Sequence, residues 1–178
     1  MNKTQFVLGS KSPRRKQLFA DAGFDFEIEI FDTDESFPDD LDPELVAEYI
    51  ALKKAAYYEK PLGNKILICA DTTVVINNEV LNKPADFNEA KSMLEKLNNN
   101  WHKVITGVCI KSDSFIHSFS ECTEVKFAAF NQEEIEYYIN NFNPYDKAGA
   151  YGAQDWLGLC KLNLLKVVFI MLLVFQCQ

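Results

Sequence analysis

The stretch that decides the fold is residues 4–15, Thr4-Gln5-Phe6-Val7-Leu8-Gly9-Ser10-Lys11-Ser12-Pro13-Arg14-Arg15. Its apolar first part, Thr4 to Leu8, predicts a short buried strand, and the small residues from Gly9 to Ser12 predict a turn. The turn ends on a favourable N-cap, and Pro13 suits the first position of a helix. We therefore expect a helix that begins at Pro13 and ends before Gly23. A strand, a turn and a helix N-terminus in this order are typical of an α/β domain.

The rest of the chain continues this alternation of strands and helices. Strands are predicted at residues 24–30, 66–70, 101–110 and 115–127, and a hairpin at 74–81 with paired asparagines at its turn. Further helices are predicted at residues 43–59, 88–97 and 133–139, the last capped by Asn131, and an acidic loop at 32–42. The fold class that follows is α/β.

Length, charge and cysteine content narrow the class of protein further. A chain of 178 residues suits one domain, or one with a small lobe. The net charge of −8 argues against a nucleic-acid coat protein but allows a local cationic site for a small anion. The five cysteines have no metal-ligand spacing, and the apolar run Phe6–Leu8 is too short for a signal peptide. We expect buried thiols and a cytoplasmic protein.

The turn that precedes the first helix has the composition of an anion site. Backbone N–H groups at a helix N-terminus attract negative charge, and Ser10, Arg14 and Arg15 add further donors. Arginine also matches phosphate geometry with two parallel hydrogen bonds. The alternative is a capped helix with exposed cations, and the turn by itself does not separate the two.

Several carboxylates are candidates for metal binding or catalysis. Asp71 follows a buried strand, and carboxylates at strand ends in α/β proteins often face the ligand. Asp34 and Glu35 lie in the acidic loop, and Mg²⁺ usually takes one or two carboxylates together with phosphate oxygens. The alternatives are a turn or cap role for Asp71 and a solvated acidic run for the other two.

Three further features have equally open interpretations. Lys83-Pro84-Ala85-Asp86 reads as a surface turn in which Asp86 caps the next helix, and Lys54 reads as a surface lysine. The loop from Asp146 to Gln154 is rich in small residues, which let the backbone approach a ligand, and Gln154 can hydrogen-bond a base edge. A tight loop without a ligand is the alternative. His102 and His117 lack partners at metal spacing and are interpreted as structural.

Taken together and in this order, these stretches resemble the Maf family of nucleotide pyrophosphatases. The similarity runs from about residue 4 to about residue 158. It rests on Leu8–Arg15, Asp34-Glu35, Ala51 with Lys54-Ala55, Ala70-Asp71-Thr72, Lys83-Pro84 with Asp86, His102 with Thr106, and Asp146–Gln154. The resemblance implies a mixed, twisted sheet with flanking helices, in two lobes around a nucleotide cleft, as in Maf and ITPase-like proteins.

The resemblance also implies hydrolysis between the α and β phosphates with a divalent cation, Mg²⁺ or Mn²⁺. By that resemblance Asp71 is the base that activates water and also lies near the metal, and Glu35 is a metal ligand. The implied phosphate-binding residues are Ser10, Arg14, Arg15, Lys54 and Lys83, with Asp86 organising the site. The implied partner is a nucleoside triphosphate, with no nucleic acid and no membrane, and a homodimer is compatible with the family.

The similarity is greatest to the subgroup that acts on dTTP and UTP. In that subgroup specificity depends on three positions, which here are Arg14, Thr72 and Gln154. The subgroup that acts on 7-methyl-GTP has a tryptophan in place of this arginine. We therefore expect dTTP and UTP, or modified pyrimidine nucleotides, as substrates. The alternatives are a 7-methyl-GTP pyrophosphatase and a non-catalytic or damaged nucleotide-binding protein.

The C-terminal tail departs from the family. We expect residues 1–158 to form the Maf-like domain and residues 159–178 an aberrant tail. The apolar run within residues 164–178 falls short of the roughly 20 residues that span a membrane. Permitted codons for this stretch, read from the third nucleotide, encode a segment close to the family's closing segment. We interpret the tail as a one-nucleotide insertion or deletion near codons 158–163, which the DNA of the gene tests.

Overall fold

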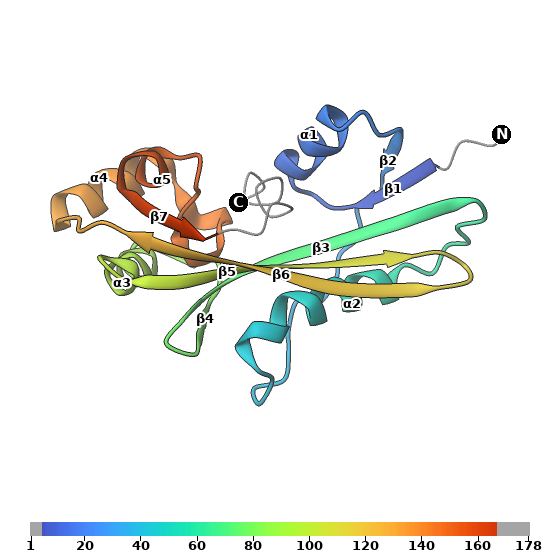
Figure 1. The fold of residues 1–178 in the computed structure, drawn as a ribbon, viewed down its shortest axis with the longest axis horizontal. Coiled ribbons are helices and arrows are strands. Elements are labelled where there is room, and N and C mark those ends of the chain that lie inside the picture. The colour runs from blue at the N-terminus through green and yellow to red at the C-terminus, as the bar shows by residue number, and fades with distance from the viewer. Residues whose placement is uncertain (1–4, 167–178) are drawn as a thin grey trace. The chain divides into compact units, whose positions relative to one another are not determined.

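The computed structural model describes residues 5–166 of the chain (Figure 1). Within them the strands are β1 (Gln5–Gly9), β2 (Phe26–Ile28), β3 (Lys65–Ile76), β4 (Glu79–Leu81), β5 (Trp101–Lys111), β6 (Ile116–Phe127) and β7 (Leu162–Lys166). The α-helices are α1 (Pro13–Asp21), α2 (Val46–Tyr57), α3 (Phe87–Leu97), α4 (Gln132–Phe142) and α5 (Trp156–Lys161). Three 3₁₀ turns are η1 (Pro43–Leu45), η2 (Pro144–Asp146) and η3 (Ala148–Ala150).

The strands form a mixed sheet in the order β2-β1-β3-β5-β6-β7, with β4 paired to β3. Strand β1 lies parallel to β2 and to β3, whereas β4 and β7 lie antiparallel to their partners. Parallel pairing follows from the crossover connection that α1 makes between β1 and β2. The predicted α/β class with a mixed sheet and flanking helices is thus confirmed.

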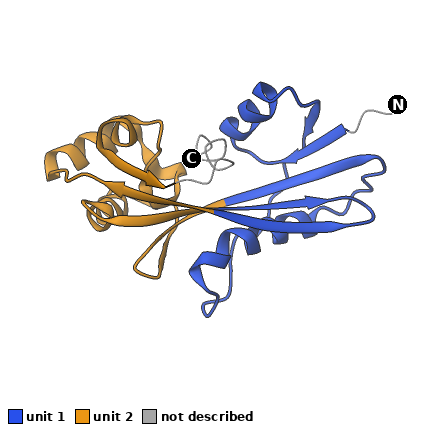
Figure 2. Ribbon diagram, in the orientation of Figure 1, with its two compact units in different colours: residues 1–71, 106–121, 177 blue, residues 72–105, 122–176, 178 orange. Residues whose placement is uncertain are grey.

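The described residues divide into two compact units, coloured separately in Figure 2. The first unit contains residues up to Asp71 and residues 106–121, and the second contains residues 72–105 and those from Cys122 onward. The division falls inside β3, β5 and β6, so each of these strands contributes to both units.

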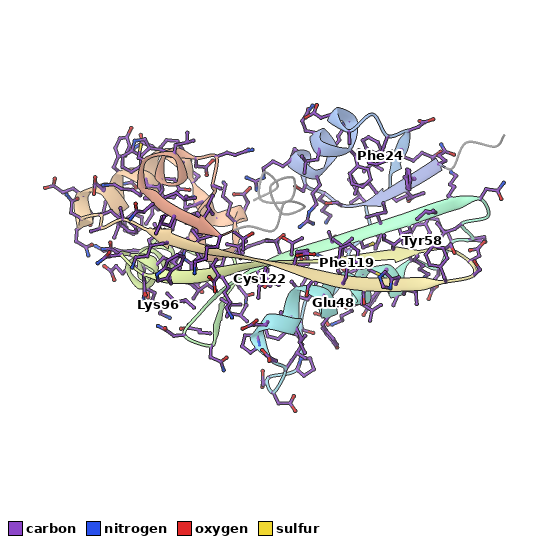
Figure 3. The ribbon with its side chains drawn as sticks, in the orientation of Figure 1. Phe24, Glu48, Tyr58, Lys96, Phe119 and Cys122 are labelled. Atoms are coloured by element: carbon purple, nitrogen blue, oxygen red, sulfur yellow. The ribbon has the colours of Figure 1, made fainter. Side chains whose placement is uncertain are left out.

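The core of the first unit forms where α2 packs on the strands. Ala51 and Ala55 are fully buried on α2, and Leu67 and Cys69, two residues apart on β3, point to the same face. Tyr58, labelled in Figure 3, packs its ring 5.6 Å from that of Phe31. This core fixes the helix that carries Lys54 and the strand that carries Asp71.

Helix α2 approaches β5 so closely that only glycine fits between them. A Cβ added at Gly107 would lie 2.3 Å from the carbonyl group of Ala47 and 2.3 Å from the backbone nitrogen of Glu48. The next residue of α2, Glu48, is labelled in Figure 3. Its Oε1 accepts a 2.7 Å hydrogen bond from Ser118 Oγ of β6. The backbone of α2 is therefore held directly against the strands.

The second unit has its own apolar core, which α3 and α4 cover. Both helices begin as expected, because Asp86 Oδ1 accepts from Glu89 N at 2.9 Å and Asn131 forms a complete capping box with Glu134. The predicted hairpin is also confirmed, since β3 and β4 pair across Asn77 and Asn78, whose φ angles are 50° and 63°.

Several boundaries differ from the sequence predictions, and α4, predicted at 133–139, extends from Gln132 to Phe142. The predicted strands 66–70 and 74–76 are one strand, β3, so Asp71 lies within a strand and not at its end. Polar residues do not end a paired strand, because its backbone groups stay hydrogen-bonded to the neighbouring strands and the threonines favour extended backbone. The strand predicted at 24–30 is shorter, and the helix predicted at 43–59 is a 3₁₀ turn followed by α2.

Regular structure continues beyond Gly158, the predicted end of the Maf-like domain. Helix α5 runs to Lys161, and β7 pairs with β6. The consecutive residues Leu164 and Leu165 of β7 are 54% and 38% exposed. The part of the predicted aberrant tail from residue 167 to 178 lies outside the described residues. Among the described residues, no helix is long and apolar enough to span a membrane.

Candidate functional site

The predicted anion loop is held against β3 by its second arginine. Ser12 caps α1 as expected, with its Oγ accepting from Arg15 N at 3.4 Å, and Ser10 Oγ accepts from Ser12 N at 3.2 Å. The Arg15 guanidinium donates through Nη1 to the carbonyl oxygen of Ala70 at 2.7 Å. The loop therefore ends beside the residue that precedes Asp71. Arg14, the neighbour of Arg15 on α1, is half-buried.

The loop also depends on a glycine that packs over a buried thiol. A Cβ added at Gly9 would lie 2.7 Å from Cys69 Sγ and 3.1 Å from the ring of Phe31. Strand β1 can approach β3 and Phe31 at this distance only because Gly9 has no side chain. The loop that follows thereby begins at the edge of the first unit's core.

Lys54 brings the candidate carboxylates of the first unit together. Its Nζ lies 2.7 Å from Asp71 Oδ1 and 2.7 Å from Glu35 Oε1. The Lys54 and Asp71 side chains are each 14% exposed, whereas that of Glu35 is 47% exposed. The sequence pattern alone predicted that Lys54 is a surface lysine, and that prediction is wrong because its side chain is largely buried. Lys54 links helix α2, strand β3 and the acidic loop through one ammonium group.

The electrostatics of this cluster follow from its burial and its charges. Burial of the Lys54 ammonium acts to lower its pKa, but the negative charges of Asp71 and Glu35 act in the opposite direction and outweigh it. The net effect is a raised Lys54 pKa, so the group remains a cation at neutral pH. A persistent positive charge at this point stabilises the two carboxylates near each other.

A neighbouring lysine, which the sequence analysis did not single out, fixes the loop that carries Glu35. Lys53 Nζ donates to Asp34 Oδ2 and to the Ser36 carbonyl oxygen, both at 2.8 Å. Hydrogen bonds from Lys53 and Ser36 hold the Asp34 pKa well below its usual range. The sequence pointed to Lys53 only as one of two adjacent lysines on a predicted helix. Sequence spacing does not show which lysine faces which carboxylate.

The remaining predicted site residues lie in the second unit. Thr72 is half-buried on β3, Lys83 and Asp86 are exposed in the segment before α3, and Gln154 is exposed in the turn before α5. Asp86 acts as the N-cap of α3, which is the structural role left open by the sequence. The loop that ends at Gln154 joins the Lys83 segment through Gly149 N, which donates to the Asn82 carbonyl oxygen at 3.2 Å.

The loop from Asp146 to Gln154 is organised by a polar network that sequence inspection did not reveal. Lys147 Nζ lies 2.8 Å from Asp146 Oδ1 and 3.5 Å from Asp155 Oδ2. Tyr138 OH donates to Asp155 Oδ2 at 3.0 Å and accepts from Gly152 N at 3.2 Å. The network ties the loop to α4, so its small residues occupy a defined conformation.

The donor set of the first unit fits a divalent cation. Among residues 5–166 no group of three or more His, Cys, Asp or Glu side chains is arranged to hold a metal ion. Asp71 and Glu35, however, direct one carboxylate oxygen each to a single cationic atom. Two carboxylates completed by substrate oxygens and water are the usual protein contribution to a Mg²⁺ site, which needs no third side chain.

The two buried cysteines are unsuited to nucleophilic catalysis. Among the described residues, Cys69 and Cys109 are buried free thiols, whereas the free thiols of Cys122 and Cys160 are half-buried and exposed, so the expectation of buried thiols holds only for the first two. Burial raises the pKa of Cys69 to about 12 and that of Cys109 to about 11. A thiol that stays protonated at neutral pH is a poor nucleophile, so covalent catalysis through these two groups is disfavoured. Cys177 lies outside the described residues.

His102 is a buried structural residue, as the sequence interpretation expected. It is 3% exposed, and its Nε2 lies 2.7 Å from Tyr151 OH. Burial lowers the pKa of His102 to about 3, so the folded protein keeps the ring neutral. His117, by contrast, is exposed on β6.

The buried ring predicts a loss of stability in acid that can be measured. An unfolded histidine titrates near pH 6.5, whereas His102 in the folded protein titrates near pH 3. The unfolded state therefore binds the extra proton first, and stability present above pH 6.5 is lost as pH falls. Between pH 7 and pH 5 we expect the free energy of unfolding of His102→Gln to fall by about 2 kcal/mol less than that of the unchanged protein. Urea unfolding at the two pH values measures this difference. The exposed His117→Gln is the control, and equal slopes for His102→Gln and the unchanged protein would contradict the assignment.

Comparison with known proteins agrees with the family resemblance. A family model described as Maf-like protein matches residues 5–165. A protein of Flavobacterium psychrophilum named dTTP/UTP pyrophosphatase is 41% identical, over 88% of this chain and 80% of the relative. Proteins of the same name from Cytophaga hutchinsonii and Porphyromonas gingivalis are each 44% identical over 89% of this chain, covering 73% and 81% of those relatives.

Two solved structures are also similar in part. The Ham1 protein of Staphylococcus aureus superposes with a TM-score of 0.49 at 16% identity, over 70% of this chain and 72% of that one. A Ham1 protein of Coxiella burnetii gives 0.48 at 13% identity, over 73% and 76%. The family match covers nearly all described residues and includes the loop, the carboxylates and the lysines described above. The chain belongs to the Maf family.

Proposed function

We propose that this protein hydrolyses dTTP and UTP to the nucleoside monophosphate and pyrophosphate with the help of Mg²⁺ or Mn²⁺. The observation that carries the proposal is the cluster in which Lys54 Nζ lies 2.7 Å from both Asp71 and Glu35. The names of the relatives that are 41–44% identical supply the substrate class. The proposed phosphate-binding residues are Ser10 in the loop before α1, Arg14 and Arg15 in the first turn of α1, and Lys83 in the second unit.

The chemistry needs a base, a positioned water and neutralised phosphate charge, because phosphoryl transfer requires little covalent help. Asp71 is the proposed base: its carboxylate removes a proton from the attacking water as the bond between the α and β phosphates breaks. Glu35 and Asp71 are the proposed ligands of the divalent cation, which neutralises phosphate charge when it is bound. Lys54 and the arginines of α1 bind phosphate oxygens.

The specificity proposal concerns Arg14, Thr72 and Gln154, which match the dTTP/UTP subgroup. Gln154 is exposed in its turn, and its amide offers a donor and an acceptor to a base edge. There are two alternatives to this proposal. The protein is a 7-methyl-GTP pyrophosphatase, or it is a nucleotide-binding protein without activity. The exposed leucines of β7 are the observation that favours the second alternative, since they lie in the segment that we interpret as an altered tail.

The test is a panel of nucleoside triphosphates scored for pyrophosphate release with Mg²⁺ and with Mn²⁺. The proposal expects dTTP and UTP to give the highest kcat/KM. A preference for 7-methyl-GTP would overturn the substrate assignment, and nucleotide binding without pyrophosphate release would overturn the activity. The DNA sequence past codon 158 separately decides whether residues 159–178 arise from a shifted reading frame.

The remaining expectations have direct measurements. The free thiols of the described cysteines suit a reducing compartment such as the cytoplasm, and cell fractionation tests that prediction. Light scattering of the purified protein distinguishes a homodimer from a monomer.

A further inference from the structure

The ammonium group of Lys54 occupies the position between Glu35 and Asp71 that the proposed function gives to the divalent cation. Its Nζ contacts Glu35 Oε1 and Asp71 Oδ1 at the same distance, 2.7 Å. These are the two carboxylates proposed to bind the divalent cation, so this inference rests on the proposed function. An ammonium and a divalent cation repel each other at such separations, so Lys54 Nζ and the metal compete for the position between the two carboxylates.

We propose that Lys54 is a built-in counter-ion that fills the metal position of the metal-free protein and leaves it when the divalent cation binds. In the metal-free protein the ammonium keeps two carboxylates side by side, which would otherwise repel each other. After displacement it is free to bind the triphosphate, whose charge arrives with the metal. One side chain thereby couples metal binding to substrate binding.

The surroundings of Lys54 confine this change to its side chain. Helix α2 is fixed by the buried Ala51 and Ala55 on either side of Lys54 in sequence and by its contact with Gly107. The lysine side chain has a flexible four-carbon stem, so its ammonium group can move while the helix stays in place. Glu35, at 47% exposure, is open to solvent and gives an incoming ion access to the pair.

A lysine outside the cluster provides the control. Lys60 lies in the same unit, has the same charge and has its own carboxylate partner, Glu29, at 2.8 Å. Loss of either Lys54 or Lys60 removes one positive charge from this unit. Only loss of Lys54 removes a cation from between Glu35 and Asp71.

The experiment measures Mn²⁺ binding to the full chain by electron paramagnetic resonance, with no nucleotide present. We expect Lys54→Met to bind Mn²⁺ at least about tenfold more tightly than the unchanged protein. In the unchanged protein Lys54 occupies the site, and the apparent affinity for Mn²⁺ is reduced in proportion to the fraction of molecules in which the site is open. Lys60→Met is expected to stay within about twofold of the unchanged protein, a difference well under the 1.4 kcal/mol of a tenfold change. Unchanged or weaker binding by Lys54→Met, or equal tightening by Lys60→Met, overturns the proposal.

A second measurement uses the unchanged protein and remains decisive if Lys54→Met fails to fold. The ¹⁵N signal of the Lys54 ammonium, assigned by its loss in Lys54→Arg, is followed while Mg²⁺ is added. We expect it to shift or broaden as the ion pair breaks, while the signal of Lys60, assigned in the same way, stays in place. A Lys54 signal that does not respond at saturating Mg²⁺ overturns the proposal. Neither measurement uses a nucleotide, so failure of pyrophosphate release in the substrate panel is a separate result.

Discussion

Asp71→Asn is expected to reduce the rate of pyrophosphate release about 10²- to 10⁴-fold, the usual contribution of a general base. Asparagine has nearly the shape of aspartate but cannot take a proton from water. Lys54 keeps Glu35 as an ionic partner at 2.7 Å, so we expect the fold to survive the change. The measurements are kcat for dTTP at saturating Mn²⁺ and thermal unfolding by circular dichroism.

The control for this variant is Glu29→Gln, which converts a carboxylate to an amide in the exposed ion pair with Lys60 in the same unit. It is expected to retain full activity, because exposed ion pairs contribute little. Turnover by a well-folded Asp71→Asn at the original rate would move the base to another residue. A loss of activity that accompanies unfolding would instead assign Asp71 a structural role.

Gly107→Ala is expected to give the largest loss of stability among alanine substitutions of the described glycines in the first unit. The new Cβ would lie 2.3 Å from the backbone of Ala47, which cannot rotate away as a side chain can. We expect the free energy of unfolding to fall by about 3 kcal/mol. For a chain of this size that corresponds to a decrease in Tm of roughly 6–12 °C. Because α2 carries Lys54 and must move, we also expect the rate of pyrophosphate release to fall.

Gly23→Ala separates this steric cause from a backbone cause. Gly23 has a φ of +72°, but a Cβ there meets no atom within 4 Å. Its substitution therefore costs only the left-handed backbone penalty of about 1–2 kcal/mol. Gly107 does not have a positive φ, so its penalty is steric. Equal destabilisation by the two variants would contradict the close approach of α2 to β5.

The sequence was informative wherever a local rule decides the structure. The caps at Ser12, Asp86 and Asn131 were predicted, because a short polar side chain satisfies helix N–H groups through neighbours in sequence. The hairpin at Asn77-Asn78 was predicted for the same kind of reason, since its turn needs residues that tolerate positive φ. The family resemblance then identified Asp71 and Glu35 as related residues, although no spacing rule connects them.

Local patterns failed where the outcome depended on contacts between distant segments. The polar run Asp71-Thr72-Thr73 appeared to end a strand, but β3 continues through it because neighbouring strands supply its hydrogen bonds. Lys53 and Lys54 look alike in sequence, and only packing of α2 directs one to Asp34 and the other to Asp71. The requirement for Gly107 is invisible without the helix that lies against it.

The sequence by itself determined the α/β class, the capped starts of α1, α3 and α4, and the set of residues shared with the Maf family, because each depends on local stereochemistry or on a motif in register. Only the tertiary structure decided that Lys54 stands between Glu35 and Asp71 and that Arg15 holds the loop to the carbonyl oxygen of Ala70. These contacts join residues up to 55 positions apart, and their geometry arises when the helices pack on the strands. The anion loop becomes part of a candidate active site through that packing.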